Sequence, residues 1–217
     1  MKAPVFPLAN VVLFPHTFLP LHVFEPRYRA MVAHALEGSR LIVVVLAREE
    51  LPPGRRPDVH AIGSVGRIDV AKRLEDGRFH LVVHGLSRVS LGDLDPRPDD
   101  YFEVRIRLRS EMLPDLQDPR VAEAKAAFLM TVRRYAEQVL SGAIPNDLLT
   151  EAVSYPVLVN RAASLLRVRV QAKQALLEID DVEARAMEVE GWMQRQIASH
   201  ASIDRFRRRR PTDSRVN

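Results

Sequence analysis

Apolar residues change their spacing abruptly at residues 114–119 of this 217-residue chain. Before that point they gather in short runs rich in β-branched types and separated by prolines and glycines, a pattern that predicts β-strands. After it they recur three and four residues apart, as on the buried face of an amphipathic helix. The sequence therefore predicts an α+β protein, with its strands in the first half and its helices in the second.

Residues 1–112 are expected to form a β-rich, closed or nearly closed barrel with one helix, because many short predicted strands follow one another. Pro26 suits the first turn of that helix, which is predicted to run to Leu36 and to end before Gly38. Residues 75–77 contain a glycine suited to a hairpin turn. Prolines among the first twenty residues place the earliest strands at edges or bulges. The predicted strands are residues 5–8, 11–14, 40–47, 61–74, 78–84, 88–94 and 101–109.

Residues 113–202 are expected to form a bundle of helices with Trp192 in its core. The last helix is predicted to start at an Asp180 cap, with Glu183 completing a capping box. Its apolar periodicity stops after Ser202, so residues 203–217 are predicted to be a basic disordered tail. The surplus apolar surface of the helices is expected to pack against the barrel or against a second copy, as a homodimer. The predicted helices are residues 121–139, 147–154, 157–166, 170–178 and 180–202.

The net charge of +4 belongs to the C-terminal end of the chain. Residues 204–217 hold six arginines and two aspartates, so the other 203 residues carry 26 basic and 26 acidic side chains. Such a tail either stays solvated or binds a polyanion weakly. The neutral body argues against a duplex-binding domain, which normally has a basic face. The candidate polyanion-binding residues are Arg205, Arg207, Arg208, Arg209 and Arg210.

The chain has no cysteine, which excludes disulfides and thiolate metal sites and favours a reducing cytosol. Its longest apolar run, residues 41–47, is much shorter than the about 20 residues of a membrane span. The N-terminus lacks the unbroken apolar stretch and the cleavage site of a signal peptide. We therefore expect a cytoplasmic protein that does not contact a membrane.

No motif with catalytic or cofactor chemistry occurs in the sequence. Phosphate-binding loops, dinucleotide-binding glycine motifs and nucleophile elbows are absent. His80 and His84 fall on a predicted strand, where side chains four residues apart stand about 13 Å from each other, too far to share one ion. The sequence therefore predicts no catalytic residue, no metal and no cofactor, and hence no enzyme.

Several segments of the chain resemble one known family. FPLANVVLFP at residues 6–15 and LPLHVFEPRY at residues 19–28 resemble the opening of the N-terminal substrate-binding domain of ATP-dependent Lon proteases. Stand-alone Lon-domain proteins and the cereblon Lon domain share this opening. IGSVGRI at residues 62–68, HGLSRV at 84–89 and KQALLE at 173–178 resemble later family segments in the same order. The resemblance implies a PUA-like pseudo-barrel followed by a helical bundle.

The same resemblance implies a function. The chain stops after this domain, so the ATPase and Ser–Lys peptidase modules of a full Lon protease are expected to be absent. The resemblance then implies a non-catalytic module that binds unfolded or tagged proteins and passes them to an AAA+ protease. One departure concerns His16, which stands where the family often has glycine, so that the bend there is expected to differ in backbone angle.

Aromatic residues beside early prolines suggest where a peptide would bind, since edges left unpaired by proline suit the capture of extended peptides. The alternative is that these aromatics all pack inward. A second hypothesis is an RNA- or DNA-binding protein that uses the PUA-like barrel and the arginine tail, because PUA-like barrels occur in RNA-binding proteins. The candidate peptide-binding residues are Phe14, Pro15, Phe18, Phe24, Arg27 and Tyr28.

Overall fold

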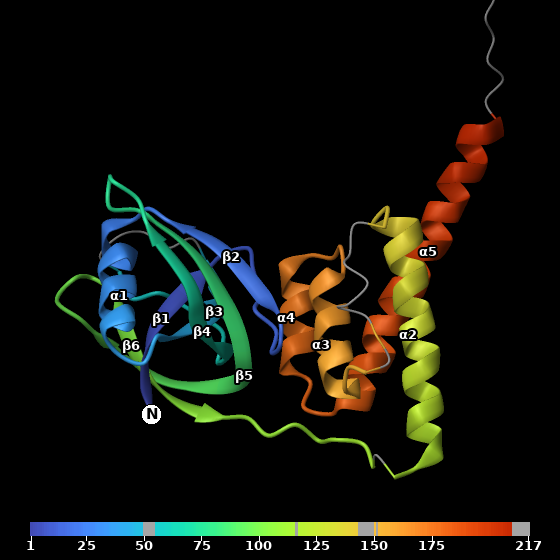
Figure 1. The fold of residues 1–217 in the computed structure, drawn as a ribbon, viewed down its shortest axis with the longest axis horizontal. Helices are drawn as coiled ribbons and strands as arrows, with labels where there is room; N and C mark the ends of the chain where they lie inside the picture. Colours follow the sequence, from blue (N-terminus) through green and yellow to red (C-terminus); the bar gives the residue numbers. More distant parts are fainter. Residues whose placement is uncertain (50–54, 116, 143–149, 151, 210–217) are drawn as a thin grey trace, which may run out of the picture.

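A computed structural model describes residues 1–49, 55–115, 117–142, 150 and 152–209 of the chain, with side chains up to residue 202 (Figure 1). Strands fill the first half and helices the second, which confirms the predicted α+β class. The strands are β1 (Lys2–Leu8), β2 (Phe18–Val23), β3 (Leu41–Leu46), β4 (Ile62–Arg73), β5 (Phe79–Pro96) and β6 (Phe102–Leu108). The helices are α1 (Pro26–Glu37), α2 (Pro119–Val139), α3 (Tyr155–Leu165), α4 (Val170–Glu178) and α5 (Val182–Arg209).

The strands form one mixed sheet in the order β2-β5-β4-β3-β1-β6, and β5 also pairs with β6. Five strands therefore close into a ring that runs from β5 through β4, β3, β1 and β6 back to β5. The 18-residue β5 makes this possible, because it pairs with β4 over its first two thirds and with β6 near its end. The pair β1–β3 is parallel and the other pairs are antiparallel.

Alternate side chains of the sheet build two separate cores. One core takes small apolar side chains, mostly valines, from all five strands of the ring and therefore lies inside it. The other lies between the sheet and α1, which buries Tyr28, Met31, Val32 and Ala35. Helix α1 begins with Pro26, as predicted, and ends at Glu37, one residue past the predicted Leu36 and directly before Gly38.

Two strand predictions were wrong at residues 11–14 and 85–87. Residues 11–14 form no strand but cross over the sheet, where the Ser64 hydroxyl donates to the Leu13 carbonyl at 2.6 Å. The predicted break after residue 84 does not exist, and β5 is continuous there. Gly85 permits this crossing within β5, because a Cβ on Gly85 would lie 2.3 Å from the Phe14 carbonyl oxygen.

Helices α2 to α5 pack around a third apolar cluster. The Asp118 side chain caps α2 by accepting from the Arg120 amide at 2.9 Å. Helix α5 is capped by Asp181 rather than by the predicted Asp180, since the Asp181 carboxylate accepts from two amides of its first turn. Trp192, predicted to lie in the core, is only partly buried. Half of the helix predicted at residues 147–154 lies outside the described residues, and residues 150 and 152–154, which are described, are not helical.

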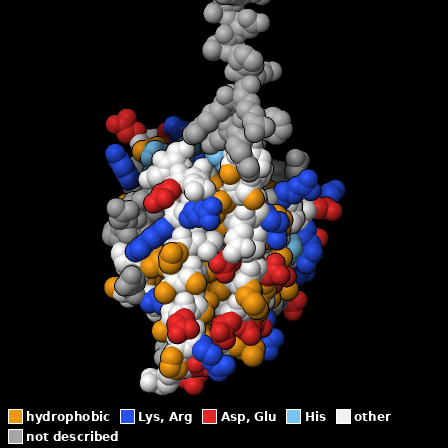
Figure 2. Space-filling model, turned by 90° about the vertical axis from the view of Figure 1, so that its right-hand side faces the viewer, with side chains coloured by type: hydrophobic (Ala, Val, Ile, Leu, Met, Phe, Trp, Pro, Cys, Tyr) orange, Lys and Arg blue, Asp and Glu red, His pale blue; other side chains and the backbone are white. Residues whose placement is uncertain are grey.

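Helix α5 continues to Arg209, seven residues past the end predicted at Ser202 (Figure 1). Its last buried apolar side chain among those described is Ile197. On the face formed by α2 and α5, apolar side chains stand among acidic and basic ones (Figure 2), and Met130 and Met187 are largely exposed. A homodimer through this surface stays a prediction. No helix in the described part of the chain is both long and apolar enough to cross a membrane.

The two halves are joined by more than the chain connection. Phe14 belongs to the first half but is completely buried in the cluster of α2 to α5. The linker between the halves is hydrogen-bonded to the turn before α5: the Met112 amide donates to the Asp180 carbonyl at 3.0 Å, and the Val182 amide donates to the Met112 carbonyl at 3.1 Å. The linker is therefore part of the contact between the halves.

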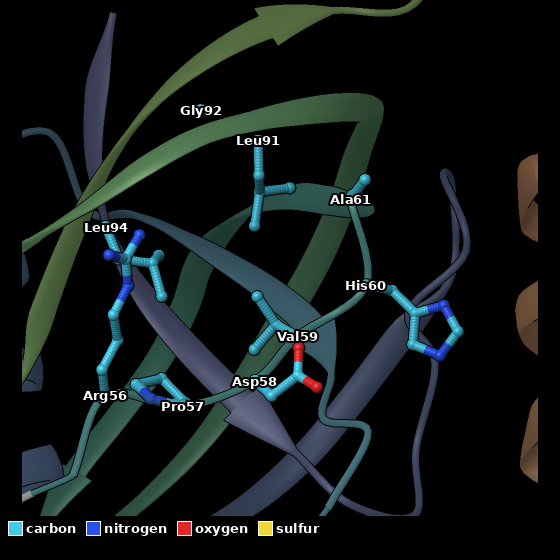
Figure 3. A pocket seen from close by; sticks show the side chains of 9 residues that line it. All are labelled: Arg56, Pro57, Asp58, Val59, His60, Ala61, Leu91, Gly92 and Leu94. Carbon is cyan, nitrogen blue, oxygen red and sulfur yellow. The ribbon is translucent and has the colours of Figure 1, made fainter.

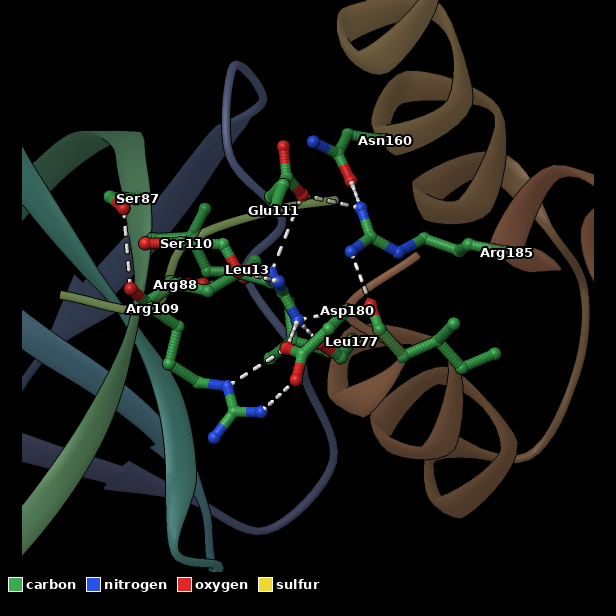
Figure 4. A network of polar contacts seen from close by, with 12 residues as sticks. Leu13, Ser87, Arg88, Arg109, Ser110, Glu111, Asn160, Leu177, Asp180 and Arg185 are labelled. Carbon is green, nitrogen blue, oxygen red and sulfur yellow. Dashed lines mark hydrogen bonds and ion pairs between the residues drawn. The ribbon is translucent and has the colours of Figure 1, made fainter. Parts of the chain in front are cut away.

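Two buried arginines lie at this junction (Figure 4). Arg88 of β5 contacts Asp180 at 2.9 Å and Glu111 at 3.4 Å. Arg185 of α5 contacts the same Glu111 at 2.7 Å and donates to the Asn160 side-chain oxygen at 2.7 Å. Because an unpaired buried charge is very unfavourable, these acidic partners are what allow two cations to lie at the junction.

The network shifts the pKa of its members. Burial lowers the pKa of Arg88, and so does its neighbour Arg185, whereas Glu111 and Asp180 act in the opposite direction. Burial acts to raise the pKa of Asp180, but hydrogen bonds from Arg109 and Arg88 outweigh it and hold that pKa below its ordinary value. Asp180 is thus more acidic in the folded chain than in the unfolded one.

Replacing Asp180 with Asn is expected to lower the free energy of unfolding by about 1–3 kcal/mol at pH 7, because Arg88 loses a charged partner. A carboxylate with a lowered folded pKa stabilises the fold above its ordinary pKa of about 3.9, and this contribution is lost as the pH falls. The variant should therefore lose less stability than the wild type on acidification. Urea unfolding from pH 7 to pH 3 measures this, with exposed Asp99→Asn as the control. Equal pH dependence of Asp180→Asn and wild type would contradict the assignment.

Residues 1–112 expressed alone are expected to aggregate or to unfold at a markedly lower temperature than the whole chain. The fragment would expose the Phe14 ring and would leave Arg88 without Asp180. Thermal melting followed by circular dichroism, together with size-exclusion chromatography, measures both outcomes. A monomeric fragment that melts cooperatively at the temperature of the whole chain would show that the halves are independent.

Candidate functional site

A row of aromatic and apolar side chains follows one face of β2 and the start of β5. In the antiparallel register Phe18 lies opposite His84, and His22 lies opposite His80. The Phe18 and His84 rings stack with centroids 4.7 Å apart, and the His22 ring lies 5.0 Å from His80 and 6.0 Å from Phe24. We call this row the aromatic strip: Phe18, Pro20, His22, Phe24, His80, Val82 and His84. Its members share a face because side chains alternate along a strand.

The aromatic strip lies at an edge of the described sheet, since β2 pairs only with β5 there. Phe18 is 56% exposed and Phe24 62% exposed. Large exposed apolar side chains on one face of an unpaired strand edge are typical of a surface that binds another chain. Pro20 has no amide hydrogen to offer at that edge, which limits uncontrolled strand pairing.

The strip leads into a groove of about 400 Å³ between the ends of β1 and β2 and the start of α1. Tyr28 forms its floor and packs on Phe6, with ring centroids 4.7 Å apart. Burial raises the pKa of Tyr28 to about 12, against the opposing effect of Arg27, so the floor is a neutral phenol. The lining residues are Phe6, Pro7, Leu8, Ala9, Asn10, Leu21, His22, Val23, Phe24, Glu25 and Tyr28.

One ion pair fixes the entry of the chain into α1 beside the groove. The Arg27 Nε donates to the Glu25 carboxylate at 2.9 Å, and the Arg27 guanidinium lies 4.6 Å from the centre of the Tyr28 ring. This cation–π contact holds Tyr28 in place. Glu25 lines the groove, and its charge is balanced by Arg27.

The structure separates the six candidate peptide-binding residues into two groups. Phe18 and Phe24 lie in the aromatic strip, Tyr28 forms the groove floor and Arg27 packs against it. Phe14 and Pro15 are buried, with Phe14 in the helical core, so neither is accessible to a peptide. The alternative that all the aromatics pack inward is wrong for Phe18 and Phe24.

Sequence reasoning missed the histidines of the strip and the β1 side of the groove. The alternation of Phe18, Pro20 and His22 with leucines was a detectable signal for β2, but the prolines obscured it. In the sequence, the opposing His80 and His84 suggest only metal ligands, because nothing local shows that they face β2. In the described residues no three His, Cys, Asp or Glu side chains are placed to hold a metal ion.

The bend before β2 contains the departure from the family pattern. His16 has a φ of 61°, in the left-handed region that glycine adopts freely and other residues adopt at a cost. Its amide donates to the Gly85 carbonyl at 2.7 Å, which holds this conformation. Burial lowers the pKa of His16, with a further contribution from His84.

Of the candidate polyanion-binding residues, Arg205, Arg207, Arg208 and Arg209 lie in the last turns of α5. Arg210 lies outside the described residues. The structure thus gives these arginines a helical backbone up to residue 209 where a disordered segment was predicted.

The family of the chain follows from comparison with known proteins. A family model described as the ATP-dependent protease La (LON) substrate-binding domain matches residues 2–195. This chain therefore belongs to the Lon substrate-binding domain family, as the motifs predicted. It is 28% identical over 199 residues to a Lon protease of Flavobacterium johnsoniae and 30% identical over 189 residues to Lon protease 2 of Myxococcus xanthus.

These matches cover 89% and 84% of this chain but only 24% and 22% of the two proteases. The chain thus spans about a quarter of the length of the curated relatives it matches. Nothing in these matches supports the nucleic-acid hypothesis.

Two solved structures share the fold. One is a Lon N-terminal domain protein from Xanthomonas campestris, with a TM-score of 0.64 at 22% identity. The other is the N-terminal domain of Mycobacterium avium complex Lon protease, with a TM-score of 0.64 at 19% identity. Each similarity covers 89% of this chain, and 99% and 98% of the respective solved chains.

The groove floor and the strip should differ in their effect on stability. Replacing Tyr28 with Ala is expected to lower the free energy of unfolding by about 3–5 kcal/mol, because the ring is buried on Phe6. Replacing Phe24 with Ser should change it by about 0.5 kcal/mol or less, because that ring is mostly exposed. Urea unfolding of both variants tests this. A large loss with Phe24→Ser would show that the ring is structural.

Proposed function

We propose that this chain is a non-catalytic module that binds extended, apolar segments of unfolded proteins along the aromatic strip and in the adjoining groove. The observation that carries the proposal is the convergence of two exposed phenylalanines, an unpaired strand edge and an apolar groove on one surface. We also assign the ring of strands to the PUA-like class and α2 to α5 to a helical bundle, on the strand pairing and the family.

In the proposed mode of binding, an extended segment lies beside β2 and adds to the edge of the sheet. Backbone hydrogen bonds to β2 would supply affinity that does not depend on sequence, and the strip would contact alternate side chains. The next apolar side chain would enter the groove, whose volume of about 400 Å³ is in the range of small ligand pockets. Aromatic and proline side chains at the strip suit many apolar partners rather than one.

This mode selects for unfolded proteins, because folded proteins bury their apolar segments and pair their strand edges. The curated relatives are named Lon proteases, and the matching family model describes a substrate-binding domain. We infer that the bound segments belong to protein substrates and that an AAA+ protease is the partner that receives them. The chain itself would bind without cleaving.

The test is binding of fluorescein-labelled, unfolded casein and of an array of internal peptides with blocked ends, measured by fluorescence anisotropy. The double substitution Phe18→Ser and Phe24→Ser is expected to weaken binding at least tenfold, about 1.4 kcal/mol, because it removes the two exposed rings. Met130→Ser is the matched control, since Met130 is 71% exposed on α2, away from the strip.

Two results would contradict the proposal. One is the absence of binding tighter than about 1 mM to any of these probes. The other is unchanged binding by the double variant, which would place the peptide site on another surface.

A further inference from the structure

A bulge in β5 opens a second region of the sheet, away from the aromatic strip. The pairing of β5 with β6 shifts register between Leu91 and Leu94, so Gly92 and Asp93 leave the regular ladder. A Cβ on Gly92 would lie 3.1 Å from the Arg105 carbonyl oxygen, so glycine lets the two backbones approach here. Two hollows meet at this glycine, because Gly92 lines both.

The first hollow is apolar at its base and has a volume of about 470 Å³ (Figure 3). Val59, Leu91 and Leu94 line it, and all three belong to or pack against the core inside the ring of strands. The hollow therefore opens at the mouth of the ring. Its polar members are engaged elsewhere: Asp58 contacts Arg48 at 3.7 Å, and His60 contacts Glu178 at 3.2 Å.

The second hollow is charged and has a volume of about 510 Å³. Its aspartates have basic partners, since Lys2 contacts Asp95 at 2.7 Å and Arg56 contacts Asp93 at 3.9 Å. Arg105 and Arg107 also line it, are exposed, and point to the same side of β6 because they are two residues apart. In the described part of the chain neither guanidinium forms an ion pair, and Arg105 acts on the same hollow only at longer range, by helping Lys2 to lower the pKa of Asp95.

We propose that these joined hollows bind the C-terminal residue of a polypeptide, with its apolar side chain in the first hollow and its α-carboxylate on Arg105 and Arg107. A C-terminal residue carries an apolar group and a carboxylate on one carbon atom, which matches an apolar hollow that adjoins two exposed guanidinium groups. Arginine is suited to this role because its planar donors bind a carboxylate with two parallel hydrogen bonds. An internal peptide segment lacks the carboxylate, and a nucleic acid lacks the apolar side chain.

This site is independent of the proposed function, because none of its residues belongs to the aromatic strip or lines the groove. The two sites also differ in the ligand they need. The strip binds internal segments of a chain, whereas the site at Gly92 requires a free C-terminal carboxylate. A protein substrate with an apolar C-terminus would satisfy both.

The test uses the full chain and peptides of seven residues, labelled at the N-terminus, in fluorescence anisotropy. One peptide ends in Leu-Val with a free carboxylate, the second is its C-terminal amide, and the third ends in Ser-Ser with a free carboxylate. The free Leu-Val acid is expected to bind at least tenfold more tightly than either of the other two.

The double substitution Arg105→Gln and Arg107→Gln should remove the preference for the acid over the amide. Arg134→Gln on the exposed face of α2 is the matched control and should keep that preference. Both arginines of the site are exposed, so an unchanged melting temperature is expected for the double variant. The Phe18→Ser, Phe24→Ser double variant should also keep the preference, which separates this site from the strip.

Equal affinity for acid and amide, or no binding of the free acid, would overturn the proposal, as would a preference that survives the Arg105 and Arg107 substitutions. A single-stranded RNA oligomer that competes with the peptide for the wild type but not for this variant would assign the hollow to polyanions instead. In that case peptide affinity would not depend on the apolar side chain at the C-terminus. Loss of the preference in the Phe18, Phe24 variant would move chain-end binding to the strip.

Discussion

The charged network at the junction holds the two halves of this chain in one arrangement. Arg88 comes from the sheet and Arg185 from the last helix, and both contact Glu111 of the connecting segment. Neither guanidinium is accessible to water. Two like charges are tolerated in such an environment only with acidic partners in fixed positions, so the network requires the sheet, the connection and the α4–α5 turn to be correctly placed together. Phe14 adds an apolar contact to the same junction.

The candidate peptide site depends on this junction without being part of it. Residues 13–17 cross from the helical core to the start of β2, with Phe14 buried among the helices and the His16 amide bonded to Gly85. The Gly85 amide in turn donates to the Thr17 carbonyl at 2.9 Å. The segment that precedes the aromatic strip is therefore fixed at both ends. A strand edge held in this way needs little further ordering when a peptide pairs with it, which favours binding.

The two proposed sites use opposite ends of β5. Near Phe79 this long strand supports β2 and the strip, and near Pro96 its bulge opens the hollows at Gly92. The first surface offers apolar contact and backbone edges, and the second offers two guanidinium groups beside an apolar hollow. A module with both surfaces would recognise an unfolded chain by its apolar content and by its end. These are features that most folded proteins do not present together.

The sequence alone determined the class of the fold, the family and the main elements. The apolar period separates strands from helices, and it placed α2, α4 and β3 well because each has a strong, uninterrupted pattern. The glycine turn at residues 75–77 was equally local, and Gly77 indeed has a φ of 81°. Such features depend on neighbouring residues only, so they can be recognised without the fold.

Tertiary contacts decided the rest. Residues 79–96 form one continuous strand, in which Gly85 marks a close crossing, because the Phe14 carbonyl lies where its side chain would be. Asp180 belongs to the buried network and Asp181 caps α5, although the two adjacent aspartates are equivalent as capping residues in the sequence. Phe14 and Phe18, four residues apart beside the same prolines, end in the helical core and on the surface. Each outcome depends on chain segments distant in sequence, and local patterns carry no information about which distant group will be there.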